Sequence, residues 1–472
     1  MFLKGRISKI YYQTWAQVAL LVGFCIVFYF LALGQWKLRG HDEVRYTQIA
    51  REIVKGGDWI SMHLHGRPYL DKPPLFFWSI ALSSYLWHGF TPFSARFPSA
   101  FFGTLTILMV FFIGKILFDS QTGFLSGFIL ATSFEFARLS TRANIDATLT
   151  FFTTASLFFF LQWFRWNIEE SERQKDVRRL SIYGFYMSMA LATLTKGPVG
   201  FLLPLMVSLV FLLIQKDWKG IRRMRLLPGL GLFLGTVLSW YLPALFEGGQ
   251  SFLHQTLFHH TIDYYSRGWT HAKPIYFYVV NFPADFLPWS LFLPGAMVYG
   301  YCKRTERGRE AVLFVFTWFV VIFLFLSFSV AKRDLYLLPL YPAASLIVSN
   351  LWRDFIFDQM KDFRREWISF PLYVLIGLVF VLGLIILWVV SKRFPSYLLG
   401  TLPVAVLLMA GGLVVFFLYR FQKYRSAFLL FVGMTAVGFF YVEHFLFLLD
   451  ETFKSAGFIL NFVKGEFGLF FR

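Results

Sequence analysis

Apolar runs of about 18 to 25 residues recur along this chain and limit what it can fold into. A helix of that length crosses the ~30 Å hydrocarbon core of a bilayer. Runs such as LTILMVFFIGKILF do not alternate between apolar and polar residues, as the strands of a membrane barrel do. Only 15% of the 472 residues are charged, against roughly 25% in a soluble domain. The sequence therefore predicts an all-α polytopic membrane protein.

The lengths of the apolar runs predict about 13 membrane-spanning helices. They cover residues 15–34, 95–118, 122–140, 147–165, 180–195, 198–215, 226–246, 276–300, 312–331, 335–351, 368–390, 398–419 and 427–449. A further apolar run, residues 74–87, has only about 14 residues and begins with two prolines. That length suits an interfacial or re-entrant helix better than a crossing.

Basic loops decide how the run at 74–87 is interpreted, because short cytoplasmic loops are enriched in Lys and Arg. We take the N-terminus as cytoplasmic and leave this run out of the spans. Every strongly basic short loop then lies on the cytoplasmic side, namely residues 165–179, 216–225, 303–309, 353–365 and 420–425. A crossing at 74–87 would move all of these loops outside. The polar segments 41–72, 142–146, 248–273 and 332–334 then share the extracytoplasmic face.

The net charge of +18 does not indicate nucleic-acid binding, since no compact basic domain exists to carry it. Most of this charge is explained by the orientation of the spans in the membrane. Cys25 and Cys302 are the two cysteines, so the sequence supports neither a disulfide framework nor a metal site built on cysteine.

The first apolar stretch, residues 15–33, is longer than the ~7 to 15 residue core of a signal peptide. We therefore expect an uncleaved signal-anchor. No repeat of fixed period and no long linker interrupts the chain. We expect one membrane domain over residues 1–450 and a short extracytoplasmic tail over 451–472, without a soluble C-terminal domain.

Residues 41–75 form the longest polar interval in the N-terminal third, and we interpret them as the active-site loop. Asp42 and Glu43 closely follow the first span, where a carboxylate can accept a proton from a hydroxyl or orient a sugar or cation. A solvated loop acid beside Arg45 is an equally good interpretation. Lys72 precedes two prolines that hold its backbone extended. It can bind a lipid phosphate or merely snorkel to the interface.

Three further outer segments carry candidate residues. Asp146 lies at the start of a span, where the helix dipole favours a carboxylate, and a simple helix-start acid would look the same. Residues 248–273 are rich in histidine and aromatic residues, which can bind a divalent metal, stack on sugars or form an interfacial belt. Lys332 and Arg333 suit a phosphate, a pyrophosphate or a uronate. Their alternative is a charged hairpin neutralised by Asp334.

Taken together, these segments resemble the GT-C glycosyltransferases. The resemblance is specifically to the superfamily of lipid A 4-amino-4-deoxy-L-arabinose transferases and dolichyl-phosphate-mannose protein mannosyltransferases. The residues that carry it are Asp42, Glu43, Arg45, Tyr46, Gly57, Asp58, Trp59, Tyr69, Lys72, Pro73, Pro74, Leu75, Arg96, Ser99, Arg142, Asp146, Lys196, Gly197, His260, His271, Pro274, Pro288, Trp289, Lys332, Tyr336, Leu338 and Pro339. Their order and spacing are fairly specific as a set.

The resemblance implies a GT-C fold with interfacial helices in the first extracytoplasmic loop. It also implies inverting transfer of a sugar from a polyprenyl (undecaprenyl-type) phosphate to a lipid A or other glycolipid, glycan or protein acceptor. The reaction would take place on the periplasmic face of the inner membrane. The motifs identify no cofactor with certainty, and the histidine-rich loop is compatible with a divalent metal.

The residues expected to act in catalysis are Asp42, Glu43 and Asp146. The residues expected to bind the donor phosphate or sugar are Lys72, Arg45, Tyr46, Tyr69, His260, Arg267, His271, Lys332, Arg333 and Tyr336. In the resulting hypothesis, Lys72 stabilises the departing phosphate with help from Lys332 or Arg333, and Asp42 positions or deprotonates the acceptor.

The main alternative is a transporter or flippase of lipid-linked sugars. Such a protein is expected to place ionisable residues or broken helices near the middle of the bilayer, often in repeated halves. Only Glu135 and Glu443 are candidates for such residues, and no inverted repeat is evident. The gathering of polar clusters at one face therefore favours the enzyme.

Overall fold

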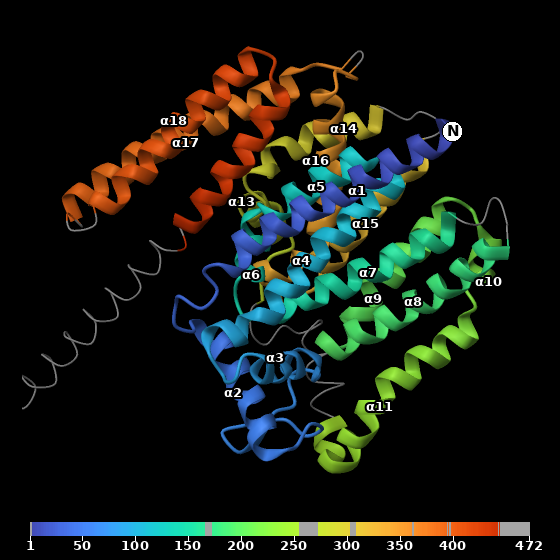
Figure 1. Cartoon of the computed structure of the whole chain (residues 1–472). Coiled ribbons are helices and arrows are strands. Elements are labelled where there is room, and N and C mark those ends of the chain that lie inside the picture. Colours follow the sequence, from blue (N-terminus) through green and yellow to red (C-terminus); the bar gives the residue numbers. More distant parts are fainter. Residues whose placement is uncertain are drawn as a thin grey trace, which may run out of the picture. The chain divides into compact units, whose positions relative to one another are not determined.

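The protein is described by a computed structural model that covers residues 2–165, 172–253, 272–302, 308–360, 363–393 and 398–441, with residues 395 and 443. Within these residues nearly all regular structure is helical (Figure 1). The exception is a hairpin of two short strands, β1 (His63–Leu64) and β2 (Arg67–Pro68), which pair antiparallel with His63 opposite Pro68 and Leu64 opposite Arg67.

The helices follow one another along the chain. They are α1 (Phe2–Cys25), η1 (Ile26–Phe30), α2 (Gly40–Gly56), α3 (Leu75–Leu86), α4 (Pro92–Leu117), α5 (Ser120–Ala131), α6 (Phe134–Ser140), α7 (Ile145–Arg165), α8 (Glu172–Lys196), α9 (Val199–Ile214), α10 (Trp218–Arg223), α11 (Leu226–Leu253), α13 (Phe277–Asp285), η3 (Trp289–Phe292), α14 (Leu293–Cys302), α15 (Arg309–Phe328), η4 (Asp334–Leu340), α16 (Tyr341–Ile356), α17 (Glu366–Arg393) and α18 (Leu398–Arg420).

Nine helical segments among the described residues are long and apolar enough to cross a membrane. They are Gln13–Phe30, Pro92–Leu117, Ile145–Phe164, Leu226–Gly248, Arg309–Phe328, Asp334–Ile356, Glu366–Lys392, Leu398–Arg420 and Tyr424–Tyr441. Each coincides with one of the predicted spans, so the polytopic α-helical class is confirmed. The exact count of thirteen is not.

The other four predicted spans fall on short, charged or interrupted helices. The span predicted at 122–140 is divided into α5 and α6. Here the hydroxyl of Thr132 donates to the carbonyl of Phe128 (2.7 Å) and that of Ser133 to the carbonyl of Leu130 (2.8 Å). Such side-chain bonds to the backbone compete with continuation of a helix. The span predicted at 276–300 is divided into α13, η3 and α14.

The remaining two predicted spans lie in α8 and α9. Helix α8 begins with charged residues, and α9 has 16 residues, so neither meets the length and composition of an ordinary crossing. The run at 74–87 forms α3, an apolar helix of 12 residues. Its length agrees with the predicted interfacial or re-entrant helix, because a crossing needs about 20 residues.

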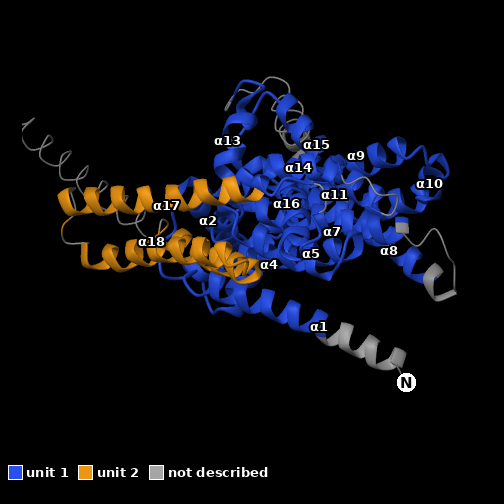
Figure 2. Ribbon diagram, turned by 90° about the horizontal axis from the view of Figure 1, so that it is seen from above, with its two compact units in different colours: residues 1–367 blue, residues 368–472 orange. Residues whose placement is uncertain are grey.

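The chain divides into two compact units, residues 1–367 and 368–472 (Figure 2). In the first unit, helices α4 and α5 meet at small residues. Gly114 of α4 faces Gly123 of α5, and a Cβ added to Gly123 would collide with the carbonyl oxygen of Phe111. Small residues of this kind let the backbones of membrane helices approach each other.

Of the candidate spans, Asp334–Ile356 is the most enclosed, with 83% of its apolar window buried, whereas Leu226–Gly248 has 22%. The second unit contains α17, α18 and the helix Tyr424–Tyr441, in which glycines again accommodate methionines: Gly383 faces Met409 and Gly411 faces Met434. The prediction of one membrane domain over 1–450 stays a prediction, and the tail 451–472 lies outside the described residues.

Candidate active site

Helix α2 carries the acids of the predicted active-site loop. It follows the extended residue Arg39, and Asp42 and Glu43 lie in its first turn, where the helix dipole favours carboxylates. Its apolar face, which includes Tyr46, is buried against α3. Gly57 ends the helix at a positive φ of 71°, a conformation that glycine adopts without strain.

Glu43 forms a buried ion pair with Arg96 of α4, at 2.9 Å from Nε to Oε1 and 2.9 Å from Nη2 to Oε2. The three remaining N–H groups of Arg96 donate to the carbonyls of Leu33, Trp36 and Lys37 at 2.8 to 3.0 Å. Arg96 thus uses all five donors of its guanidinium. It fixes the end of the first span to the start of α2.

The carboxylate of Glu43 also receives backbone N–H groups, from Arg39 (2.8 Å) and from Ala143 (2.8 Å). Burial opposes ionisation of this group, but the bonds from Arg96 and the two amides outweigh it, and the pKa of Glu43 lies below its ordinary value. Each of its oxygens therefore has protein partners. Glu43 was predicted to be catalytic. Its contacts are instead those of a residue that positions α2 and α4.

Asp42 lies beside Glu43 but has a different environment. Its Oδ1 accepts a hydrogen bond from Arg45 Nη2 (2.6 Å), and its Oδ2 accepts one from Arg333 Nη2 (3.2 Å). The side chain is 23% exposed, against 5% for Glu43. The structure therefore brings together Asp42 and Arg333, which are almost 300 residues apart in the sequence, and leaves the carboxylate partly accessible.

Arg45 lies between two tyrosines of the same predicted set. Its guanidinium carbon is 5.4 Å from the ring centre of Tyr46 and 5.9 Å from that of Tyr69. Both rings are buried and pack edge-on against Phe77 of α3, at 5.5 and 5.7 Å between ring centres. Burial raises the pKa of both phenols, so they are neutral hydrogen-bonding groups at physiological pH.

Asp146 stands at the start of α7 and forms a buried ion pair with the ammonium of Lys196, at the end of α8. The amide of Asp146 donates to the side chain of Asn144 (2.7 Å), and the amide of Asn144 donates to the hydroxyl of Ser99 on α4 (3.0 Å). The Lys196 ammonium also lies 4.1 Å from the ring centre of Tyr336. Asp146, Lys196 and Tyr336 thus form one contact group from three elements.

Lys72 is half-buried in the segment that leads into α3. Burial and the nearby positive charge of Lys196 lower its pKa to about 8, although Asp71 and Asp146 act in the opposite direction. Asp42 and Arg333 in turn lie close enough to influence Lys196. The acids Asp42 and Asp146 and the cations Arg45, Lys72, Lys196 and Arg333 therefore form one electrostatic cluster.

Lys332 does not join this cluster. Its ammonium donates to the carbonyls of Lys273 (3.0 Å) and Ser329, and its side chain is 3% exposed. It fastens residues 272–273 to the segment before η4, where Ala272 also bridges to Ala331. Of the predicted pair of cations, only Arg333 contacts Asp42, because the two side chains leave the extended backbone in different directions.

Three predicted site residues lie outside the described residues: His260, Arg267 and His271. In the part of the chain that the structure describes, no three His, Cys, Asp or Glu side chains lie close enough together to hold a metal ion. The histidine-rich segment that made a metal compatible with the sequence is among the residues not described.

Lys196 and Arg96 were part of the family pattern but were not singled out for the site. They can be identified from the free-energy cost of burying a charged side chain. A buried cation in an apolar helix is expensive, so it requires a carboxylate or carbonyl partner. Lys196 ends α8 and Arg96 lies in α4, and each meets an acid from the predicted loops.

Comparisons with known proteins show which transferases this chain resembles in sequence. The family model for dolichyl-phosphate-mannose-protein mannosyltransferases matches residues 71–241, a range that includes Lys72, Asp146 and Lys196. A relative from Pseudomonas fluorescens (strain Pf0-1), named undecaprenyl phosphate-alpha-4-amino-4-deoxy-L-arabinose arabinosyl transferase 2, is 29% identical over 82% of this chain and 67% of its own length. A Pseudomonas aeruginosa arabinosyl transferase (strain UCBPP-PA14) is 28% identical over 71% of this chain and 59% of its own length.

Solved structures show the same fold. ArnT from Cupriavidus metallidurans, solved with bound undecaprenyl phosphate, superposes with a TM-score of 0.76 over 89% of this chain and 75% of its own, at 24% identity. An oligosaccharyltransferase from Archaeoglobus fulgidus gives 0.54 over 77% of this chain and 54% of its own, at 12% identity. The chain has the fold of these membrane glycosyltransferases and is similar in sequence, over most of its length, to the 4-amino-4-deoxy-L-arabinose transferases.

Proposed function

We propose that the protein transfers a sugar from an undecaprenyl-type polyprenyl phosphate to a lipid acceptor at the periplasmic face of the inner membrane. The observation that carries this proposal is the cluster of four cations and two acids, Arg45, Lys72, Lys196, Arg333, Asp42 and Asp146, next to the short apolar helix α3. Such a cluster suits an anionic head group whose chain lies in the bilayer.

The cations are assigned to the leaving phosphate. As the bond between the anomeric carbon and the phosphate oxygen breaks, its electron pair stays on that oxygen, and the growing negative charge is stabilised by Lys72 and its neighbours. Asp71 and Asp146 influence the Lys72 ammonium through their charge. We assign this ammonium to the incoming phosphate. Lys196, held by Asp146, contributes from the other side.

Asp42 is assigned to the acceptor. When the attacking group is a hydroxyl, the carboxylate takes its proton as the new bond to the anomeric carbon forms. When the attacking group is a phosphate, which is already an anion, no proton has to move and Asp42 only orients it. Arg45 and Arg333 hold the carboxylate in place in either case.

The acceptor is proposed from the family resemblance of the sequence. The names of the relatives describe transfer of 4-amino-4-deoxy-L-arabinose, and we propose a lipid A or similar glycolipid acceptor for this chain; a glycan or a protein is the alternative. His260, Arg267 and His271 remain proposed donor-binding residues on the strength of the sequence pattern. Lys332 is proposed to support the loop that carries Arg333.

The test uses the full chain in detergent with a radiolabelled undecaprenyl phosphosugar and a phosphorylated glycolipid. The expected result is a labelled glycolipid, lost in Lys72→Ala and retained in Lys219→Ala, which removes an exposed lysine from α10. A flippase would instead move the labelled lipid across a vesicle membrane and yield no glycosidic product. That outcome would overturn the proposal.

A further inference from the structure

The first extracytoplasmic loop has a second, outward face that takes no part in the site. Residues 37–72 contain seven Lys and Arg residues against five acids. Cations in an extracytoplasmic loop run against the preference that keeps them on the cytoplasmic side. Arg45 and Lys72 are explained by the site. Other cations, such as Lys55 and Arg67, are exposed and have no role in the site.

Helix α2 separates its two faces by helical spacing. Tyr46, Ile49, Ala50 and Ile53 are buried, whereas Gln48, Arg51, Glu52 and Lys55, which recur at intervals of three and four residues, lie on the opposite side. The outward side of α2 is therefore polar along its second half and carries two cations.

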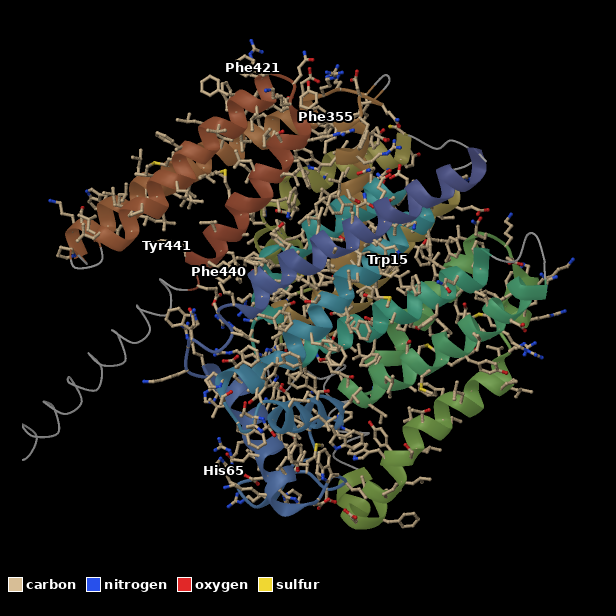
Figure 3. The ribbon with its side chains drawn as sticks, viewed as in Figure 1. Trp15, His65, Phe355, Phe421, Phe440 and Tyr441 are labelled. Atoms are coloured by element: carbon tan, nitrogen blue, oxygen red, sulfur yellow. The ribbon has the colours of Figure 1, made fainter. Side chains whose placement is uncertain are left out.

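The β1–β2 hairpin adds to this face. Its two central residues, His65 and Gly66, both have positive φ (55° and 73°), as in a tight two-residue hairpin turn. Their amides donate to the carboxylate of Glu52, at 2.9 and 3.3 Å. The tip is thereby fastened to the outward side of α2, and His65 lies exposed at the surface with Arg67 two residues on (Figure 3).

Two sets of contacts connect this face to apolar helices, one to the end of α3 and one to the span Leu226–Gly248. The guanidinium of Arg51 lies 5.6 Å from the ring centre of Phe90, just after α3, whose end exposes Leu82, Tyr85, Leu86 and Trp87. Beyond the hairpin base, Trp240 near the end of the span Leu226–Gly248 donates to the carbonyl of Ile60 (3.1 Å), and Ser61 donates to Glu247. Trp240 is buried and links the loop to the span, whereas Tyr85 and Trp87 are exposed, and exposed tyrosine and tryptophan mark the level of lipid head groups.

We propose that Arg51, Lys55, His65 and Arg67, named here the basic face, bind the phosphate head groups of anionic phospholipids in the outer leaflet. The occupant is the bilayer itself, because the cations lie in the same unit as the exposed apolar end of α3, which carries Tyr85 and Trp87. Glu52, the acid among them, is engaged by the hairpin tip. Lipid binding at this face would hold α2, and with it Asp42, at a fixed height above the bilayer.

The experiment follows amide hydrogen exchange of residues 51–67 in the full chain, in nanodiscs of phosphatidylcholine with or without phosphatidylglycerol. Phosphatidylglycerol is expected to slow exchange at the hairpin, and 0.5 M NaCl to reverse this by screening. The combined variant Arg51→Gln, Lys55→Gln, Arg67→Gln should lose the dependence on phosphatidylglycerol. Each cation removed should weaken head-group binding about fivefold.

A matched variant, Lys219→Gln, Arg222→Gln, Arg223→Gln, removes three cations from α10 and should keep the slowed exchange. Equal exchange in the two lipids, or a dependence that survives in the Arg51, Lys55, Arg67 variant, would overturn the proposal. A phosphorylated glycolipid acceptor is the other occupant. If the glycolipid were the occupant, adding it to phosphatidylcholine nanodiscs would slow exchange at the hairpin, at concentrations where phosphatidylglycerol has no effect. That result would also contradict the binding of anionic phospholipids.

Discussion

At the scale of single residues, the central feature is the different fate of neighbouring acids. Asp42 and Glu43 look interchangeable in the sequence, and both were predicted to be catalytic. In the structure Glu43 is enclosed by Arg96 and two amides, while Asp42 is held by two arginines and remains partly exposed. The partner of Glu43 is 53 residues away, so sequence reasoning had no local sign of it.

The Glu43–Arg96 pair leads to a stability prediction. Both side chains are 5% exposed, so removing one leaves the other charged and buried without compensation. Glu43→Gln or Arg96→Gln alone should lower the free energy of unfolding by roughly 3–5 kcal/mol. The double variant should lose less than the sum of the two. Urea unfolding followed by tryptophan fluorescence in mild detergent checks this, and additive losses would contradict it.

Lys72 leads to a prediction on pH. Because its pKa is lowered to about 8, the free enzyme holds the cationic form below that pH and loses it as the pH rises above it. The value of kcat/KM for the donor should therefore fall above about pH 8. In Lys72→Arg, whose guanidinium stays charged, any remaining activity should not fall there. A decline at the same pH in both proteins would show that another group is responsible.

At the scale of elements, the long apolar helices were predictable from the sequence, whereas the interruptions in two of the predicted spans were not. Length and apolar character identify Pro92–Leu117 directly. The break between α5 and α6 depends on hydroxyls of Thr132 and Ser133, residues that also occur inside uninterrupted helices such as α7. The short helix α3 was predictable, because its length and the prolines before it are both in the sequence.

The contact between α4 and α5 leads to a packing prediction. Gly123→Ala places a methyl group against the carbonyl oxygen of Phe111 and should destabilise the protein by about 1–3 kcal/mol. Gly235→Ala, on the open side of α11, has nothing within 4 Å of the new methyl group and should be neutral or slightly stabilising. Thermal unfolding of the two variants in one detergent compares them. Equal effects would contradict the close contact.

At the scale of the whole molecule, the topology brings three distant segments to one place. Parity of the spans and the basic loops predicted that residues 41–72, 142–146 and 332–334 share a face. The ion pair Asp42–Arg333 and the hydrogen bond from the Ala143 amide to Glu43 show that these segments meet. The cations that face the site were not all predictable. Lys332 was expected there with Arg333, and Lys196 was not expected. The spacing of residues in the sequence does not show in which direction a side chain points or which helices are in contact.

The most direct test of the account is the rate of sugar transfer by Asp42→Asn, measured with the full chain, a labelled undecaprenyl phosphosugar and an acceptor with a free hydroxyl. The matched control is Asp176→Asn, which neutralises an exposed acid near the start of α8. We expect Asp42→Asn to be slower by about 10²- to 10⁴-fold, with donor binding retained through Lys72, and Asp176→Asn to be unchanged. Transfer by Asp42→Asn at the rate of the unaltered protein would contradict the account.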